Sequence, residues 1–232
     1  MARVESDMMQ LGYDSRAISD RPAMSSCQYV TYGVKRAIDI VGSAAALIFL
    51  APLLVIVALL LLARDPGPVF YSQERVGLGG RKFRIFKFRT MCVDSDQVLA
   101  DLLLRDPQAR QEWSTRQKLA NDPRISSFGR FLRISSIDEL PQLFNVLRGD
   151  MSLVGPRPIV DEEALRYGRH FEAYCLCRPG LTGLWQVSGR NNTSYQRRVA
   201  MDVAYSRAVC FFFDLRILAA TVPVVIKAEG SS

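Results

Sequence analysis

The amino-acid sequence predicts a mostly helical α+β protein that is attached to a membrane and carries one small domain beside it. Three observations predict this class. Residues 40–63 form a run without any charge, helical spacing of apolar residues recurs at 94–121 and 142–148, and residues 81–90 alternate broadly as a strand does. With 232 residues, the chain is long enough for one domain with an appendage.

The uncharged run at 40–63 is more apolar than the core helix of a soluble protein needs to be, so we expect it to contact lipid. Pro52 divides it into two arms, each about 16 to 18 Å long, and one arm crosses about half of a hydrocarbon core of roughly 30 Å. Two arrangements therefore fit: a kinked helix that spans the membrane, and a re-entrant helix-break-helix that enters one leaflet and returns. Basic residues flank both ends of the run, which favours both ends lying on the cytoplasmic side.

The segments on either side of this run differ from it in composition. Residues 1–34 mix Ser, Asp, Arg and Met without clear periodicity, as a flexible arm does. Residues 211–226 are apolar but contain two charges and Pro223, so we expect them to lie at the membrane interface or to pack on the domain. The predicted organisation is a flexible N-terminal arm over 1–34, a membrane segment over 35–64 and a membrane-associated domain over 65–232.

The charged and reactive residues restrict the chemistry that the chain can perform. Thirty Lys and Arg stand against 23 Asp and Glu, a formal charge of +7, which favours polyanionic partners such as nucleic acid, anionic lipid or nucleotides. The five cysteines are an odd number without zinc-site spacing, so we expect them to be reduced, in the cytosol. His170 is the only histidine. Enzymatic chemistry would therefore rest on carboxylates and cations.

The stretch SSIDELPQL (135–143) places two carboxylates, Asp138 and Glu139, just before a proline. Pro141 is tolerated only near the start of a helix, and the apolar spacing that follows it stops at a glycine, a suitable C-terminal cap. Asp138 or Ser136 would then be the N-cap. Two interpretations remain open. The acids cap the helix and stabilise it by about 0.3 to 1 kcal/mol, or the helix start gathers a phosphate and the carboxylate that attacks it.

Three further segments suit anionic ligands. Between residues 74 and 91 the chain carries six Lys or Arg and one acid, which indicates a lipid-headgroup face or, because aromatic residues are interspersed, a nucleic-acid groove. Arg157 stands between two prolines, so a stiff loop presents either a phosphate-binding guanidinium or a merely solvated one. The loop 178–191 has three glycines, which permit close approach of a ligand or simply form turns.

Six motifs, in one order over about residues 34–228, resemble those of the bacterial sugar transferase family, the monotopic polyprenyl-phosphate phosphoglycosyl transferases. The motifs are KRAIDI, FLAPLL, FYSQERVG, FKFRTM, SSIDELPQLFNVLRGDMSLVGPRP and RPGLTGLWQVSGRN. Residues 94–124 are more similar to the branch that begins exopolysaccharide or O-antigen units with a hexose 1-phosphate than to the shorter diacetamido-sugar branch.

The resemblance implies an enzyme that moves a hexose 1-phosphate from a UDP-sugar, UDP-galactose or UDP-glucose, to undecaprenyl phosphate and releases UMP. It implies that Asp138 is the nucleophile of a covalent phosphosugar intermediate and that Glu139 is its partner, the two carboxylates together holding Mg²⁺. It also implies substrate-binding roles for a further set of residues: Lys87, Arg89, Arg133, Arg157, Gln186 and Arg190.

The same resemblance implies a re-entrant membrane segment, although Ala51 stands where the family often has a serine before the proline. The protein would then be monotopic, on the cytoplasmic face of the bacterial inner membrane, with a small cytoplasmic catalytic domain. Its expected partners are the UDP-sugar, undecaprenyl phosphate and inner-membrane lipid, not nucleic acid, and a homodimer is compatible with this branch. The alternative is a membrane-anchored scaffold that binds anionic lipid or nucleic acid through its basic face, in which Asp138 and Glu139 only cap a helix.

Overall fold

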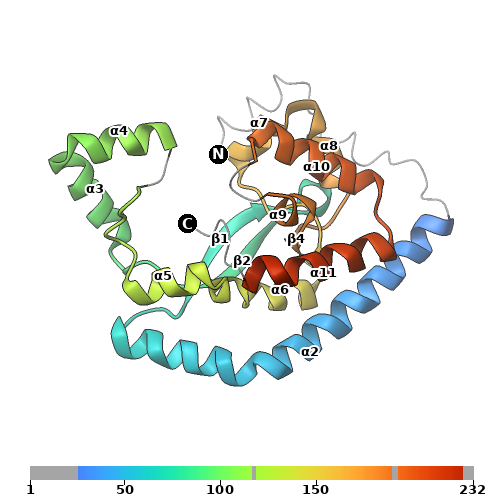
Figure 1. Cartoon of the computed structure of the whole chain (residues 1–232), viewed down its shortest axis with the longest axis horizontal. Coiled ribbons are helices and arrows are strands. Elements are labelled where there is room, and N and C mark those ends of the chain that lie inside the picture. Colours follow the sequence, from blue (N-terminus) through green and yellow to red (C-terminus); the bar gives the residue numbers. More distant parts are fainter. Residues whose placement is uncertain (1–25, 117–118, 190–192, 227–232) are drawn as a thin grey trace.

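The computed structural model describes residues 26–116, 119–189 and 193–226, which form a mostly helical α+β fold, as predicted (Figure 1). Two small sheets lie among the helices, one antiparallel (β1 and β2) and one parallel (β3 and β4). The strands are β1 (Phe70–Val76), β2 (Lys82–Phe88), β3 (Ser152–Val154) and β4 (Gly180–Thr182). The helices are α2 (Ser26–Arg64), α3 (Ser95–Arg105), α4 (Pro107–Arg116), α5 (Ser127–Ile134), α6 (Gln142–Arg148), α7 (Asp161–Tyr167), α8 (Phe171–Cys175), α9 (Leu184–Val187), α10 (Tyr195–Arg207) and α11 (Phe211–Ile226), with the 3-10 helices η1 (Leu78–Gly80), η2 (Ile137–Glu139) and η3 (Gly168–His170).

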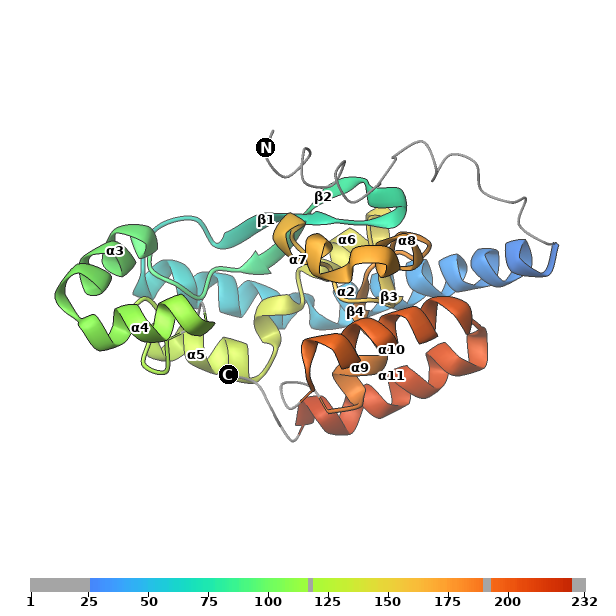
Figure 2. The same cartoon turned by 90° about the horizontal axis from the view of Figure 1, so that it is seen from above.

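The predicted membrane segment is one long helix, α2, which lies along one side of the domain (Figures 1 and 2). Among the described residues, it is the one helix that is long and apolar enough to cross a membrane. We predicted a break at Pro52, but the helix continues through this proline and curves along its length. Proline removes one hydrogen bond and crowds the preceding turn, which can bend a helix without ending it. Residues 26–34, expected in the flexible arm, are helical too, whereas residues 1–25 lie outside the described residues.

Helix α6 holds the β1–β2 hairpin against α2. The side-chain oxygen of Asn145, a fully buried residue of α6, accepts a hydrogen bond from the Phe86 backbone N–H at 3.0 Å, and its amide nitrogen donates to the Arg84 carbonyl at 2.7 Å. Gly149 ends α6 with a φ of 93°, as the predicted C-terminal cap. The Arg36 guanidinium of α2 then donates to two carbonyls of the last turn of α6, where a cation is favoured.

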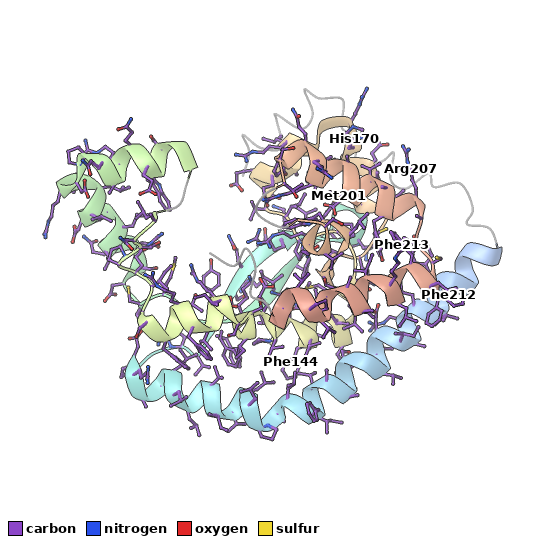
Figure 3. The ribbon with its side chains drawn as sticks, viewed as in Figure 1. Phe144, His170, Met201, Arg207, Phe212 and Phe213 are labelled. Carbon is purple, nitrogen blue, oxygen red and sulfur yellow. The ribbon has the colours of Figure 1, made fainter. Side chains whose placement is uncertain are left out.

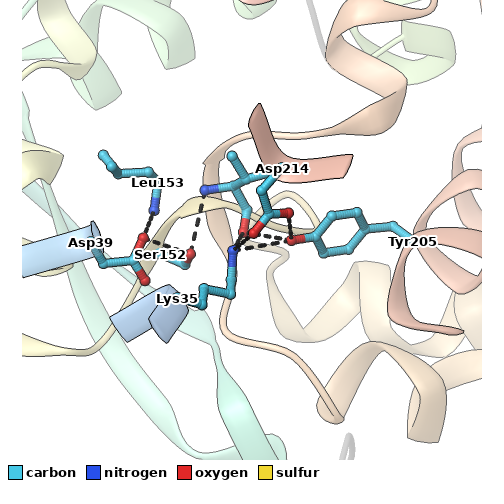
Figure 4. Close-up of polar contacts among 7 residues, drawn as sticks. Lys35, Asp39, Ser152, Leu153, Tyr205 and Asp214 are labelled. Atoms are coloured by element: carbon cyan, nitrogen blue, oxygen red, sulfur yellow. Dashed lines mark hydrogen bonds and ion pairs between the residues drawn. The ribbon is translucent and has the colours of Figure 1, made fainter. Parts of the chain in front are cut away.

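A buried polar network ties the start of α2 to the C-terminal half of the chain (Figure 4). The Lys35 ammonium donates to the Asp214 carboxylate at 2.5 Å and to the Tyr205 hydroxyl at 3.2 Å. One turn later in α2, the Asp39 carboxylate accepts a hydrogen bond from the Ser152 hydroxyl at 3.0 Å. Removing one member of a buried ion pair leaves a charge without a partner, so these contacts fix α2, β3, α10 and α11 as one unit.

Helix α11 packs on the domain through one face. This is one of the two arrangements that we expected for residues 211–226. Ile217 is buried, and Phe213 stacks on Tyr205 with ring centres 5.9 Å apart. Phe212, next to it in the chain, is 78% exposed (Figure 3). The helix therefore has a face that contributes to the core and a face that presents large apolar side chains outward.

The segment 94–121 forms two helices that project from the body of the domain (Figure 1). They are separated at Asp106 and Pro107, as predicted, and the Asp106 carboxylate accepts hydrogen bonds from two backbone N–H groups of the first turn of α4. The Arg124 guanidinium lies 5.0 Å from the ring centre of Trp113 and forms a 2.6 Å ion pair with Asp122. These contacts connect α4 to the loop that leads into α5.

Candidate active site

The two predicted catalytic carboxylates lie in a sharp turn between α5 and α6. Ser136 has a φ of 57°, and it turns the chain from α5 into η2, which contains Asp138 and Glu139. A positive φ is uncommon outside glycine, and such conformations cluster at functional sites. The predicted N-cap, Asp138 or Ser136, is wrong. The Ser136 side chain makes no capping hydrogen bond, and α6 begins later, with Pro141 at its N-cap.

Asp138 is the buried member of the pair, with 8% of its surface exposed. Burial, together with the neighbouring charge of Glu139, raises the pKa of the Asp138 carboxyl to about 6, and the positive charges of Lys87 and Arg133 act in the opposite direction. The group is thus ionised at neutral pH but poorly hydrated. A carboxylate in this state is suited to attack an electrophile, because little bound water must first be removed.

Lys87 and Arg133 approach the carboxylates from two different elements. Lys87, on β2, donates to the Glu139 carboxylate at 2.5 Å. Arg133, in the last turn of α5, donates from its Nε to the Thr90 hydroxyl at 2.8 Å, and the charge of Asp138 acts on its guanidinium. The structure therefore brings together four of the residues predicted for the site: Lys87, Arg133, Asp138 and Glu139.

Arg89, also predicted to bind substrate, makes its contacts at the end of α2. It is buried, and its guanidinium donates to the Asp65 carbonyl and lies 3.4 Å from the Asp65 carboxylate. These contacts connect the hairpin to the C-terminal end of α2. A role for Arg89 in binding phosphate stays a prediction.

Arg157 lies in a second group of polar side chains, around Trp185, and Gln186 follows this tryptophan in α9. The guanidinium carbon of Arg157 is 5.8 Å from the Trp185 ring centre, and that of Arg198, on α10, is 4.6 Å from the same ring. The side-chain oxygen of Gln186 is buried and has no hydrogen-bond partner among the described residues. Arg190 lies outside the described residues.

Three residues near Trp185 or Arg157 were not predicted from the sequence: Arg198, which lies over the Trp185 ring, and Arg75 and Asp202, on which the charge of Arg157 acts. Arg198 and Asp202 are four residues apart on α10 and therefore share one face of that helix. The Asp202 carboxylate accepts a hydrogen bond from the Tyr167 hydroxyl at 2.7 Å. Arg75 comes from β1, where it shares a face with Tyr71. The spacing within each element is visible in the sequence, but the approach of Arg75 and Asp202 to Arg157 is a tertiary arrangement.

Asp202 makes the stability of the protein depend on pH. Burial raises the pKa of its carboxyl to about 7, although the Tyr167 hydrogen bond and the Arg157 charge lower it. Between about pH 4 and pH 7 the folded protein binds a proton that the unfolded chain releases, so the free energy of unfolding falls as the pH rises, by at most about 4 kcal/mol.

We expect Asp202→Asn, which stays neutral, to remove most of this fall between pH 4 and pH 7. Chemical unfolding of the detergent-solubilised protein at several pH values measures it, with Glu162→Gln, an exposed carboxylate, as the matched control. Identical pH profiles for Asp202→Asn and the wild type would show that the carboxyl does not titrate as described.

The carboxylate pair is also the candidate magnesium site. Mg²⁺ takes oxygen ligands and is commonly held by one or two carboxylates together with substrate phosphates. The part of the chain that the structure describes contains no group of three or more His, Cys, Asp or Glu side chains arranged to hold a metal. The protein would therefore supply Asp138 and Glu139, and the substrate the other oxygens. The repulsion between these carboxylates, which contributes to the raised pKa of Asp138, fits a divalent cation.

The sequence is similar to proteins of one known family. A family model described as "Bacterial sugar transferase" matches residues 30–228. The chain belongs to this family. The match includes the carboxylate turn and the group around Trp185. A UDP-galactose-lipid carrier transferase of Erwinia amylovora is 48% identical over 198 residues, which are 85% of this sugar transferase and 41% of the relative.

Two other relatives extend the comparison. The exopolysaccharide production protein ExoY of Rhizobium meliloti is 45% identical over 197 residues, 85% of this sugar transferase and 87% of ExoY. A UDP-glucose:undecaprenyl-phosphate glucose-1-phosphate transferase of Caulobacter vibrioides is 35% identical over 240 residues, 100% of this chain and 84% of the relative. This sugar transferase thus spans about two-fifths of the length of the Erwinia protein and most of the length of the other two.

Proposed function

We propose that this sugar transferase moves a hexose 1-phosphate from a UDP-hexose to undecaprenyl phosphate and releases UMP, as the first membrane step of exopolysaccharide or O-antigen synthesis. The observation that carries the proposal is the buried Asp138 carboxylate beside Glu139, with Lys87 and Arg133 as neighbouring cations. The substrates are those for which the Erwinia and Caulobacter relatives are named. The formal charge of +7 suits two anionic substrates.

The proposed reaction is a double displacement at phosphorus. An oxygen of the Asp138 carboxylate attacks the phosphorus that bears the sugar, and the bond from this phosphorus to the bridging oxygen breaks, with the electron pair leaving on UMP. A phosphate oxygen of undecaprenyl phosphate then attacks the same phosphorus, and Asp138 leaves as a carboxylate. Neither half-reaction requires a proton transfer, so neither needs an imidazole. The only histidine, His170, lies on the side of the domain away from α2 (Figure 3).

The neighbouring side chains control the charge at this site. Lys87 and Arg133 reduce the repulsion between the Asp138 carboxylate and the oxygens of the approaching diphosphate. Glu139 orients the Lys87 ammonium through their 2.5 Å contact and, with Asp138, would hold Mg²⁺. A bound Mg²⁺ ion neutralises charge that develops on the phosphate oxygens.

The assay that tests the proposal measures UMP release from UDP-glucose, UDP-galactose and their N-acetyl forms, with and without undecaprenyl phosphate. We expect the acceptor to support continuous UMP release with UDP-glucose or UDP-galactose. A preparation that releases no UMP from any of these sugars, yet binds liposomes or DNA with a steep salt dependence, would contradict the proposal and favour a scaffold.

We further propose that the protein is monotopic: α2, although continuous through Pro52, enters one leaflet and returns to the same side, with the domain on the cytoplasmic face of the bacterial inner membrane. Both halves of α2 contact this domain. Arg36 donates to the Val146 carbonyl at 2.6 Å, whereas Val57 and Leu61 belong to the same buried cluster as Phe88. Contacts along both halves of α2 support an arrangement in which the helix stays beside the domain, on one side of the membrane.

Helices α5, α6 and α11 are proposed to lie at the membrane interface. Each exposes a phenylalanine: Phe131 is 54% exposed, Phe144 48% and Phe212 78%. Figure 1 shows these three helices on the side of the domain that faces α2. Exposed aromatic side chains beside an apolar helix suit the headgroup region of a bilayer.

The topology predicts that both ends of α2 are inaccessible from outside the cell. We expect Asp20→Cys, in a variant without native cysteines, to react with an impermeant thiol reagent only after the cells are permeabilised. Glu162→Cys, in the domain, is the matched control and should behave identically. Labelling of Asp20→Cys but not of Glu162→Cys in intact cells would show that α2 spans the membrane.

A further inference from the structure

We propose that Thr90 is a positioning residue of the carboxylate site: its hydroxyl holds the Arg133 guanidinium apart from the Asp138 carboxylate, which leaves space between them for a phosphate of the substrate. This inference rests on the proposed function, because it concerns the site at which that reaction would occur. Thr90 was not among the predicted site residues, although it belongs to the motif FKFRTM.

The contact between Thr90 and Arg133 is a side-chain hydrogen bond between distant parts of the chain. Thr90 follows β2 by two residues and is 9% exposed. Its hydroxyl oxygen accepts a hydrogen bond from Arg133 Nε at 2.8 Å. A guanidinium has five N–H donors in a planar fork, and this bond uses the one on Nε. It leaves the donors of the two terminal nitrogens, which are the ones that bind a phosphate in a forked geometry.

Close packing of α5 brings the two residues together. A Cβ atom at Gly129 would lie only 2.1 Å from the Thr90 carbonyl oxygen, so α5 can approach this closely only with a glycine here. Gly129 and Arg133 are four residues apart and share one face of α5. An antiparallel bridge between Met91 and Ile125 holds the next residue of the Thr90 segment in place. The backbone therefore fixes the position of the hydroxyl relative to Arg133.

Arg133 and Asp138 are close enough for their charges to act on each other, but they do not pair. Each charge stabilises the ionised form of the other residue. In the part of the chain that the structure describes, however, no ion pair joins the two side chains. An opposite charge at short range attracts a long, flexible arginine side chain. A second contact must therefore restrain the guanidinium, and the Thr90 hydroxyl supplies it.

The other charged groups around Arg133 do not replace this restraint. Asp122 and Arg124, in the loop before α5, also act on the Arg133 guanidinium, the first by attraction and the second by repulsion. They form a 2.6 Å ion pair with each other, so their opposite charges largely cancel at Arg133. The hydrogen bond to Thr90 is thus the directional contact that orients the guanidinium.

The separation has a consequence for catalysis. A carboxylate that is paired with an arginine is a weaker nucleophile, and the arginine in such a pair has fewer donors left for the substrate. When the two groups are held apart, Asp138 can attack the phosphorus while Arg133 stabilises the charge on the phosphate oxygens. Without the Thr90 hydroxyl, Arg133 could turn toward Asp138 and form the ion pair that the structure avoids.

The experiment measures kcat and KM for UMP release from UDP-glucose and UDP-galactose by the purified full-length protein in detergent, with undecaprenyl phosphate present. Thr90→Val keeps the shape of the side chain but removes the hydroxyl, and we expect it to lower kcat about tenfold while KM for the UDP-hexose stays within about twofold. Thr90→Ser keeps the hydroxyl and should retain kcat within about threefold. The matched control is Thr182→Val. Thr182 is 7% exposed and shares a 2.8 Å hydrogen bond with the Thr221 hydroxyl, and its loss should leave kcat at the wild-type value.

A double-mutant cycle tests whether Thr90 acts through Arg133. In an Arg133→Met background, Thr90→Val should lower kcat no further, because the group that Thr90 orients is already absent. Losses that multiply in the double variant would overturn the inference. Thermal unfolding of each variant separates loss of positioning from loss of folding, and Thr90→Ala is the decisive variant if Thr90→Val does not fold.

Two further outcomes would overturn the inference while the proposed function stands. One is a folded Thr90→Val variant with the wild-type kcat. The other is a loss in Thr90→Ser as large as that in Thr90→Val, which would show that the methyl group and not the hydroxyl matters. Absence of UMP release by the wild type would instead refute the proposed function, and this inference with it.

Discussion

Asp138→Asn is expected to abolish hexose-phosphate transfer, with a fall in kcat of at least about a thousandfold. The amide has nearly the shape of the carboxylate but carries no charge and cannot form the acyl phosphate. Because Asp138 is buried and next to Glu139, the substitution also removes the repulsion between the two carboxylates, so the fold should be retained or slightly stabilised. UMP release and covalent retention of labelled sugar phosphate measure the effect together, and both should be lost.

The matched control for this substitution is Asp161→Asn. Asp161 pairs with Lys82 at 2.6 Å on the hairpin, at the end of β2 away from Lys87, and its loss should leave kcat within about twofold of the wild type. If Asp138→Asn kept a tenth or more of the wild-type turnover, Asp138 could not be the nucleophile. The carboxylate pair would then serve only to hold a cation or to shape the turn.

Lys87→Met is expected to lower kcat/KM by about a hundredfold. The substitution removes the ammonium that contacts Glu139 at 2.5 Å and that opposes the raised pKa of Asp138. Only the ionised carboxylate attacks, so the activity of the wild type should decline as the pH falls through the Asp138 pKa of about 6. Without the ammonium, this pKa rises, and the acid limb of the kcat/KM profile should move to higher pH.

Lys82→Met is the control for the lysine substitution, because Lys82 begins the same strand and its ion pairs with Glu74 and Asp161 are exposed to solvent. Its pH profile should coincide with that of the wild type. An acid limb in Lys87→Met that stays at the wild-type pH would show that the ammonium does not act on Asp138. A lower kcat/KM in that variant would then reflect lost contacts to substrate alone.

The spacing of residues along the chain was sufficient to predict several elements of the fold. The break between α3 and α4 lies at Asp106 and Pro107, where the sequence predicted it, because proline excludes the preceding residue from a helix. Strand β2 lies within the predicted segment 81–90. Its partner β1 was not predicted, because the prolines at 66 and 68 indicated a turn in the segment that leads into this strand. The continuity of α2 through Pro52 depends on packing along both halves of the helix, which periodicity does not describe.

The carboxylate turn shows why the candidate site was only partly predictable. Ser136 and Glu139 have the spacing of a capping box, and local rules therefore favoured a cap. In the structure Glu139 instead pairs with Lys87, which is 52 residues away in the sequence. A contact of this kind is decided by the packing of β2 against η2. The resemblance to a family identified Asp138, Glu139, Lys87 and Arg133, whereas Arg75, Arg198 and Asp202 emerge only from the three-dimensional arrangement.

The most direct test of the covalent mechanism is a single-turnover experiment without undecaprenyl phosphate. The purified protein is mixed with UDP-hexose and Mg²⁺, UMP is quantified, and the digested protein is analysed by mass spectrometry. We predict a burst of UMP that approaches one per active site and a hexose phosphate attached to the peptide that contains Asp138. A protein that releases no UMP until the acceptor is added, and that carries no modified peptide although it turns over fully with the acceptor, would contradict the account and indicate direct transfer.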